Sequence, residues 1–276
     1  RKDSQALAIK VRESFGDTPV LISAKEKTGI EQIRRTILEK LPPDFGQQSI
    51  TGTLVTENDL VLLVMPPDLP APHGRLILPQ QQTIRGVLEA GATAVVVRDD
   101  ELWDTLQNLG KKPKLVITDS QVFGKVAKEI PSDVMLTSFS ILFARYKGEL
   151  EVQVRGAKAL DHLKNGDKVL ICEGCTHHRQ CGDIGTEKLP NWIRKHTGQE
   201  IEFHFTSGTE FPMDLSEYRM IIHCGGCMLN EREMKYRIAC AQDAGIPITN
   251  YGVAIAYMNG ILKRSVEVFP EIWKTL

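Results

Sequence analysis

The segment "ICEGCTHHRQCGD", residues 171–183, has a distant counterpart in "IIHCGGCMLN", residues 221–230. Each segment begins at the end of an apolar run, as a buried strand does, and continues into a loop of cysteine, histidine and glycine. Loops of this kind gather at the carboxyl edge of a parallel α/β sheet, where ligands bind. The two segments are therefore predicted to meet in space.

These two segments also concentrate the reactive side chains of the chain. They hold five of its six cysteines and three of its seven histidines. Clustered cysteines in a chain without the composition of a secreted disulfide scaffold indicate metal or redox chemistry. A structural zinc, an iron-sulfur cluster and a redox dithiol each fit this observation.

Apolar runs that alternate with helical segments extend the α/β pattern in both directions. In residues 151–276 the predicted strands are "KVLI", "IEFHF", "YRMII" and "IPIT", and the predicted helices are "KALDHLKNG", "EKLPNWIRKHTG" and "NEREMKYRIACAQDAG". In residues 44–150 the predicted strands are "DLVLLVMP", "TAVVVRD", "KLVITD" and "DVMLTS", and the predicted helices are "PQQQTIRGVLEAGA" and "SQVFGKVAKEIP". Each region is predicted to form a mostly parallel sheet covered by helices.

The first 43 residues form a separate strand-loop-helix unit in this interpretation. A short apolar run, Val20 to Ile22, predicts a strand, and apolar residues at helical spacing from Ile30 predict an amphipathic helix that is stopped by Pro42 and Pro43. The first residue is Arg, so we expect that further sequence precedes this unit and carries part of the function.

The amino-acid composition argues against some classes of binding partner. Hydrophobic residues make up 42% of the chain and charged residues 25%, and the formal net charge is -1, so no polyanion-binding surface and no nucleic-acid partner is predicted. There is no apolar run long enough to span a bilayer and no signal peptide, which predicts a cytoplasmic protein without a membrane partner.

The paired spacings Cys172-x-x-Cys175 and Cys224-x-x-Cys227 match a zinc ribbon, in which all four thiolates close the metal site. Each pair here follows a predicted parallel strand instead of a hairpin knuckle, and the histidines exceed what a four-cysteine site needs. Gly225 and Gly226 would let the backbone pass close to a bulky centre. A helix is predicted after Cys227, with Asn230 as its cap and Glu233 as the capping-box partner.

The residues "CTH", 175–177, and "HCGGC", 223–227, resemble the C-x-H and H-C-x-x-C signature of the HydF family, the maturation factors of FeFe-hydrogenase. The flanking "CGDIGTEKLPNW" and the "GRLILPQ" of the preceding region also resemble that family, so the resemblance covers the whole chain. It implies that residues 44–150 form a dimerisation domain and residues 151–276 a domain that binds an iron-sulfur cluster.

The resemblance also implies a ligand set. Three cysteines hold a 4Fe-4S cluster in this family and leave one iron with an exchangeable, non-cysteine ligand, and the motif assigns Cys175, Cys224 and Cys227 to this role. His177 and His223 match the histidines of the signature, either as the fourth ligand or, as we favour, through hydrogen bonds that orient the cluster. Cys172 is predicted to be a buried thiol, and Cys181 either borders the site or lies at the surface. Cys240 is predicted to lie in the core. His178, His196 and His204 have no support from the motif and are predicted to be structural or exposed.

The opening unit resembles the end of a P-loop GTPase domain. "SAK", residues Ser23, Ala24 and Lys25, resembles the loop that contacts guanine in such domains. Neither a G-x-x-x-x-G-K-[ST] loop nor an N-K-x-D stretch occurs in the chain, so GTP and Mg would be bound only with a preceding domain.

The function implied by the resemblance is that of a scaffold or carrier. It would accept a di-iron precursor of the hydrogenase active site and deliver it to apo FeFe-hydrogenase, as a homodimer that works with the radical enzymes HydE and HydG. The main alternative is a structural zinc module that uses Cys172, Cys175, Cys224 and Cys227. A thiol redox enzyme ranks lowest, because the tryptophan-proline context of a thioredoxin-type motif is missing from the sequence.

Overall fold

The computed structural model describes residues 2–16, 18–40, 49–67, 76–174 and 183–276. The chain separates into two compact units, Arg1–Gln48 and Ser49–Leu276. The domain boundaries expected from the sequence, after residues 43 and 150, stay predictions.

The first unit consists of two helices, α1 (Lys2–Phe15) and α2 (Ile30–Lys40). The amphipathic helix expected from Ile30 is confirmed as α2, although none of its residues is buried. The strand predicted at Val20–Ile22 is wrong, because the described part of this unit offers only an isolated antiparallel bridge between Ser23 and Thr28. A strand needs a partner for its backbone groups, and no second strand lies in residues 2–16 and 18–40.

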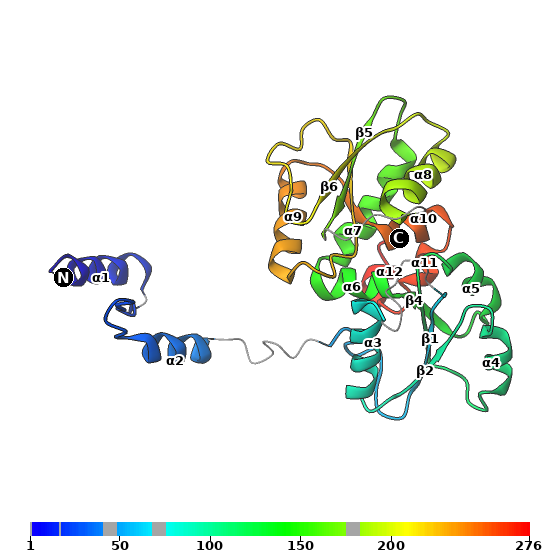
Figure 1. The fold of residues 1–276 in the computed structure, drawn as a ribbon, viewed down its shortest axis with the longest axis horizontal. Coiled ribbons are helices and arrows are strands. Elements are labelled where there is room, and N and C mark those ends of the chain that lie inside the picture. The colour runs from blue at the N-terminus through cyan, green and yellow to red at the C-terminus, as the bar shows by residue number, and fades with distance from the viewer. Residues whose placement is uncertain (1, 17, 41–48, 68–75, 175–182) are drawn as a thin grey trace. The chain divides into compact units, whose positions relative to one another are not determined.

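The second unit contains two parallel sheets, which confirms the predicted α/β class. The first has the strand order β2-β1-β3-β4 and consists of β1 (Leu60–Val64), β2 (Thr93–Val97), β3 (Leu115–Thr118) and β4 (Met135–Ser138). Each of these strands falls within an apolar run named above. The helices between them are α3 (Leu78–Glu89), α4 (Leu102–Asn108) and α5 (Phe123–Glu129) (Figure 1).

The second sheet has the order β6-β5-β7-β8. Its strands are β5 (Lys168–Glu173), β6 (Glu202–Ser207), β7 (Met220–His223) and β8 (Ile248–Asn250), all parallel. One face packs against α9 (Glu231–Asp243), and the other packs against α8 (Leu189–Thr197) and α10 (Tyr251–Met258). A π-helix at Ile184–Lys188 leads into α8, and the helix expected at "KALDHLKNG" is a 3-10 turn, Lys158–His162, that follows α7 (Leu150–Ala157).

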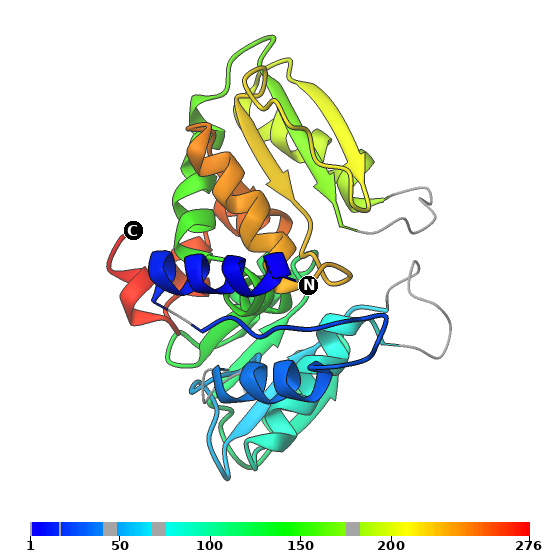
Figure 2. The ribbon, with the colours of Figure 1, turned by 90° about the vertical axis from the view of Figure 1, so that its left-hand side faces the viewer.

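Helices join the two sheets into one body. Helix α6 (Phe139–Lys147) leaves β4 and packs against α9 and α10, and α10 also packs against α7 and α8. The short helices α11 (Leu262–Ser265) and α12 (Pro270–Trp273) pack into the apolar core of the first sheet through Leu262 and Ile272. Figure 1 shows α10 to α12 between the two sheets, and Figure 2 shows the two sheets after a quarter turn. The carboxyl edge of the second sheet lies against α6, since Nδ2 of Asn250, at the end of β8, donates to the carbonyl of Ser140 in α6 at 3.2 Å.

None of the helices in the described parts of the chain is both long and apolar enough to cross a bilayer.

Candidate functional site

The carboxyl ends of β5 and β7 bring the two cysteine segments together. Cys172 is paired with His223 in the parallel register, and the amide of Cys224 donates to the carbonyl of Cys172 at 2.8 Å. The prediction that the two segments meet is thus confirmed as far as Gly174. Cys175, His177, His178 and Cys181 lie outside the described residues.

Cys224 sits in an environment that favours an anionic sulfur. Its Sγ accepts hydrogen bonds from the amide of Gly174 at 3.0 Å and from the amide of Gly226 at 3.4 Å. Hydrogen bonds to the charged form of an acid stabilise that form, and a thiolate is the state in which cysteine binds a metal. These two hydrogen bonds distinguish Cys224 from the buried thiol of Cys172.

Cys227 follows in the same loop and is also partly exposed. Its carbonyl and those of Gly226 and Leu229 accept hydrogen bonds from the ammonium group of Lys147, at 2.8, 3.2 and 2.7 Å. Lys147 is the last residue of α6 and thus reaches this loop from the region of the first sheet. Burial lowers the pKa of Lys147, and the nearby thiols of Cys227 and Cys224 oppose that shift.

The two glycines of this loop differ in their surroundings. A Cβ added at Gly225 would meet no atom of the described residues within 4 Å, so these residues leave the space above it open. Gly226 has φ +62°, a conformation that L-residues rarely adopt, and a Cβ there would lie 2.5 Å from Sδ of Met234. Gly225 thus leaves room beside the thiols, whereas Gly226 is required by the turn itself.

His223 is buried, with 1% of its surface exposed, and both of its ring nitrogens are engaged. Nη1 of Arg237 donates to Nε2 of His223 at 3.0 Å, because a guanidinium has no acceptor. Nδ1 therefore carries the proton, which it donates to the carbonyl of Cys224 at 2.8 Å. Burial lowers the pKa of His223 to about 4, so the ring is neutral near pH 7. In this arrangement His223 supports the backbone of the cysteine loop and has no free nitrogen for a metal.

Arg237 anchors this arrangement from α9. It is fully buried, and its Nε and Nη2 donate to the carboxylate of Glu233 at 2.8 Å and to the carbonyl of Gly208 at 3.0 Å. The helix cap at Asn230 is confirmed, since its Oδ1 accepts from the amide of Glu233 at 2.8 Å. The capping-box role of Glu233 is wrong, because its carboxylate binds Arg237 instead.

Cys172 is fully buried, as predicted, in the apolar cluster that packs against α9. Burial raises the pKa of its thiol to about 11, so it is protonated at neutral pH. Cys240, on α9, is half-buried at the border of the same cluster. Among the described residues no group of three or more His, Cys, Asp or Glu side chains converges as a metal site, so Cys172 does not join Cys224 and Cys227.

The two remaining candidate histidines among the described residues, His196 and His204, form hydrogen bonds with neighbouring side chains. His196 binds the carboxylate of Asp161 at 2.9 Å, and His204 binds Glu202 at 2.7 Å and Tyr218 at 3.2 Å. Both were expected to be structural or exposed.

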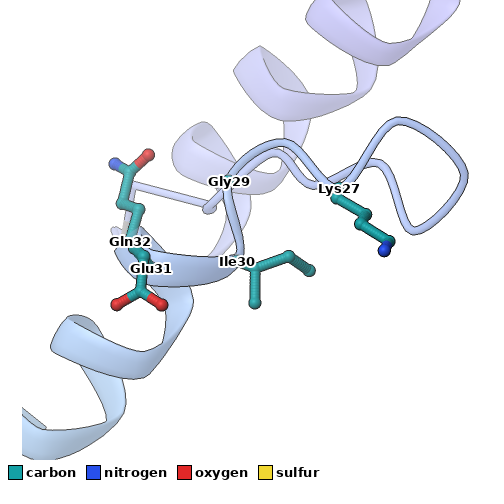
Figure 3. A pocket seen from close by; sticks show the side chains of 5 residues that line it. All are labelled: Lys27, Gly29, Ile30, Glu31 and Gln32. Atoms are coloured by element: carbon teal, nitrogen blue, oxygen red, sulfur yellow. The ribbon is translucent and has the colours of Figure 1, made fainter.

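The loop with Ser23, Ala24 and Lys25 lies in the first unit. Ser23 exchanges two backbone hydrogen bonds with Thr28, at 3.0 and 3.1 Å, and its Oγ accepts from the amide of Glu26 at 3.1 Å. An open pocket of about 650 Å³ lies beside the residues that follow this loop. It is lined by Lys27, Gly29, Ile30, Glu31 and Gln32 (Figure 3). Ser23, Ala24 and Lys25 do not line it, and their assignment to a guanine-contacting loop stays a prediction.

Two of these residues, Lys147 and Arg237, were missed by the sequence analysis. Arg237 shares helical spacing with the buried residues Met234, Ile238 and Ala241, and an arginine at a core position signals a buried ion pair. Lys147 ends a helix in another part of the chain and offers no comparable signal.

Two sequence-family models match the chain. One is described as "Hydrogen maturase F dimerization domain" and matches residues 50–148, and the other is described as "Hydrogen maturase F tetramerization domain" and matches residues 151–268. No curated protein matches the chain at a significant level. Among solved structures, an ABC transporter solute binding protein from Burkholderia multivorans matches at 12% identity with a TM-score of 0.23, over 80% of this chain and 93% of that one. At this TM-score the likeness carries no argument.

Proposed function

The chain belongs to the hydrogen maturase F family, and from this premise we propose that it is a maturation scaffold whose cysteine edge holds a 4Fe-4S cluster. The observation that carries the proposal is the position of Cys224 and Cys227. Both follow β7 in a partly exposed loop, beside the end of β5, from which the chain runs on toward Cys175.

The described residues fit such a cluster. Thiolates are the usual ligands of iron-sulfur clusters, and hydrogen bonds to their sulfurs tune the potential. Cys224 receives two such bonds from backbone amides, and the open space at Gly225 leaves room beside it. Cys175, Cys224 and Cys227 would be the three ligands. When bound, the cluster would supply one iron whose fourth ligand can be exchanged, and that iron would accept the di-iron precursor.

His223 has a supporting role in this proposal. Its two ring nitrogens bind Arg237 and the Cys224 carbonyl, which fixes the loop that carries two of the ligands. The fourth position would then be filled by another group, and His177 stays a candidate for it.

The structural zinc site is the weaker alternative. It needs four deprotonated thiols in one tetrahedron, and Cys172 is buried, protonated and turned toward α9. This favours a site with three cysteines.

The matched domains support the formation of oligomers. We propose that β2 provides one contact, since it is an edge strand of the first sheet and Val96 is 49% exposed on it. The opposite edge, at β4, is packed against α11.

Apo FeFe-hydrogenase and the radical enzymes HydE and HydG would be the partners of the scaffold in the cytoplasm. GTP and Mg would bind only together with a P-loop, which this sequence lacks.

Iron content in a series of cysteine variants tests the proposal. After anaerobic reconstitution, Cys175→Ala, Cys224→Ala and Cys227→Ala should each lose most of the iron, whereas Cys172→Ala and Cys240→Ala should retain it. If the first three variants keep the iron content of the unaltered protein, the cluster does not use these cysteines. If instead the unaltered protein holds one zinc in place of iron, and Cys172→Ala loses it as fully as Cys227→Ala, the four-cysteine zinc site is favoured.

A further inference from the structure

Lys147 makes an unusual set of contacts for a lysine. Its ammonium group lies at 3.2, 2.8 and 2.7 Å from the carbonyl oxygens of Gly226, Cys227 and Leu229. The three carbonyls belong to one turn, which is closed by a hydrogen bond of 3.0 Å from the amide of Leu229 to the carbonyl of Gly226. The lysine therefore binds the inner side of the turn that carries Cys227.

The number of these contacts indicates the charge state of Lys147. Three acceptors require three N–H donors, which the ammonium form supplies and the neutral amine does not. The aromatic ring of Phe143, 5.4 Å from Nζ, adds a further favourable contact for a cation. A positive charge is thus held, half-buried, beside the loop of Cys224 and Cys227.

Lys147 belongs to a different part of the fold from the loop it holds. It ends α6, which begins directly after β4 of the first sheet with Ser138 as its cap, whereas the loop follows β7 of the second sheet. Helix α6 also packs against α9, which begins directly after the loop. The matched dimerization and tetramerization domains meet at this contact.

We propose that Lys147 is a positioning residue for the cysteine site. Its ammonium group holds the Gly226–Leu229 turn in place and supplies the positive charge that raises the reduction potential of a cluster bound by Cys224 and Cys227. The electrostatic half of this proposal rests on the proposed cluster, and the positioning half does not. Lys147 thus ties the geometry of the site to the part of the chain that matches the dimerization domain.

The charge of Lys147 acts on a bound cluster through Coulomb's law. A cation near a cluster favours the more negative, reduced state, and the effect is large where water is partly excluded. Replacing Lys147 with a neutral side chain should therefore move the potential to more negative values. Arginine keeps the positive charge on a side chain of similar length, so Lys147→Arg should have a reduction potential close to that of the unaltered protein.

Two measurements on the complete chain test the two halves separately. The first is hydrogen-deuterium exchange of the protein without iron, for the unaltered protein, Lys147→Met and the control Lys125→Met, whose lysine binds Asp99 at 2.9 Å within the other half of the unit. Amides in residues 226–229 should exchange faster in Lys147→Met only. Equal exchange in all three proteins would show that Lys147 does not hold the turn.

The second measurement is the reduction potential of the reconstituted cluster in Lys147→Met, Lys147→Gln and Lys147→Arg. A shift to more negative potential in the first two, largely reversed in the third, is the expected result. If Lys147→Met does not fold, Lys147→Gln decides, because it keeps hydrogen-bond donors without the charge. An unchanged potential overturns the electrostatic half. If the unaltered protein binds no iron, the proposed function fails, while the exchange experiment still decides the positioning role.

Discussion

Replacing Arg237 with methionine should destabilise the protein far more than any surface change on the same helix. The substitution removes the donors to the His223 ring and the Gly208 carbonyl and leaves both acceptors without them. Each buried acceptor left unsatisfied costs about 1–3 kcal/mol, and the partly exposed carboxylate of Glu233 regains water. We expect a loss of about 3–5 kcal/mol, in the range for breaking a buried ionic network.

The assay is urea unfolding of the protein without iron, with Lys235→Met as the matched control. Lys235 lies on the same helix and pairs with Glu231 at 2.6 Å, but both side chains are about half exposed, so its loss should cost less than about 0.5 kcal/mol. Arg237→Met should also speed hydrogen exchange of the Cys224 amide, because His223 then loses its orientation. If the two variants unfold at the same urea concentration, the buried network does not stabilise the site and the reasoning is refuted.

Three further predictions follow from the same structure. Gly226→Ala should lower the free energy of unfolding in urea by about 1–2 kcal/mol, because Gly226 has a left-handed backbone conformation. Gly225→Ala should change it by less than about 0.5 kcal/mol, and equal losses in the two variants would contradict the assigned conformations. Val96→Lys should shift the oligomer to a smaller species in light scattering while Val96→Thr does not, and an unchanged mass would exclude the β2 edge as an interface. The hydrogen bond from Lys114 lowers the pKa of Asp59 to about 2 from 3.8, so its stabilisation exists above pH 4 and disappears as pH falls toward 2. After allowance for solvent screening, Asp59→Asn should lose about 1 kcal/mol at pH 7 and progressively less below pH 4, and a pH-independent difference in urea unfolding would be inconsistent with this shift.

The strands could be predicted from the sequence because parallel strands buried on both faces need continuous apolar runs. Every predicted strand of the two sheets is present, and the meeting of the two cysteine segments followed from their place after strands. The strand at Val20–Ile22 was predicted from the same signal, but an apolar run forms a strand only where a partner is available.

Helix α7 was not predicted from the sequence, and Gly156 within it is a residue that disfavours helices. In the structure this glycine lets α7 approach β8, since a Cβ there would lie 2.0 Å from the carbonyl oxygen of Ile248. A tertiary contact of this kind leaves no periodic signal in the sequence.

The contacts that complete the site are also tertiary. Glu233 fits a capping box by its spacing, yet the buried guanidinium of Arg237 competes successfully for its carboxylate. Lys147 reaches carbonyl groups some 80 positions further along the chain. Motif spacing singles out the thiols as candidate ligands, but the groups that hold their loop follow from packing alone.

Iron analysis and EPR spectroscopy of the anaerobically reconstituted, unaltered protein decide whether three cysteines hold a cluster. We expect about four irons per chain and, after reduction, the EPR signal of a 4Fe-4S cluster that changes when imidazole is added, because one iron is open to exchange. A colourless protein with one tightly bound zinc and no EPR signal would rule this cluster out.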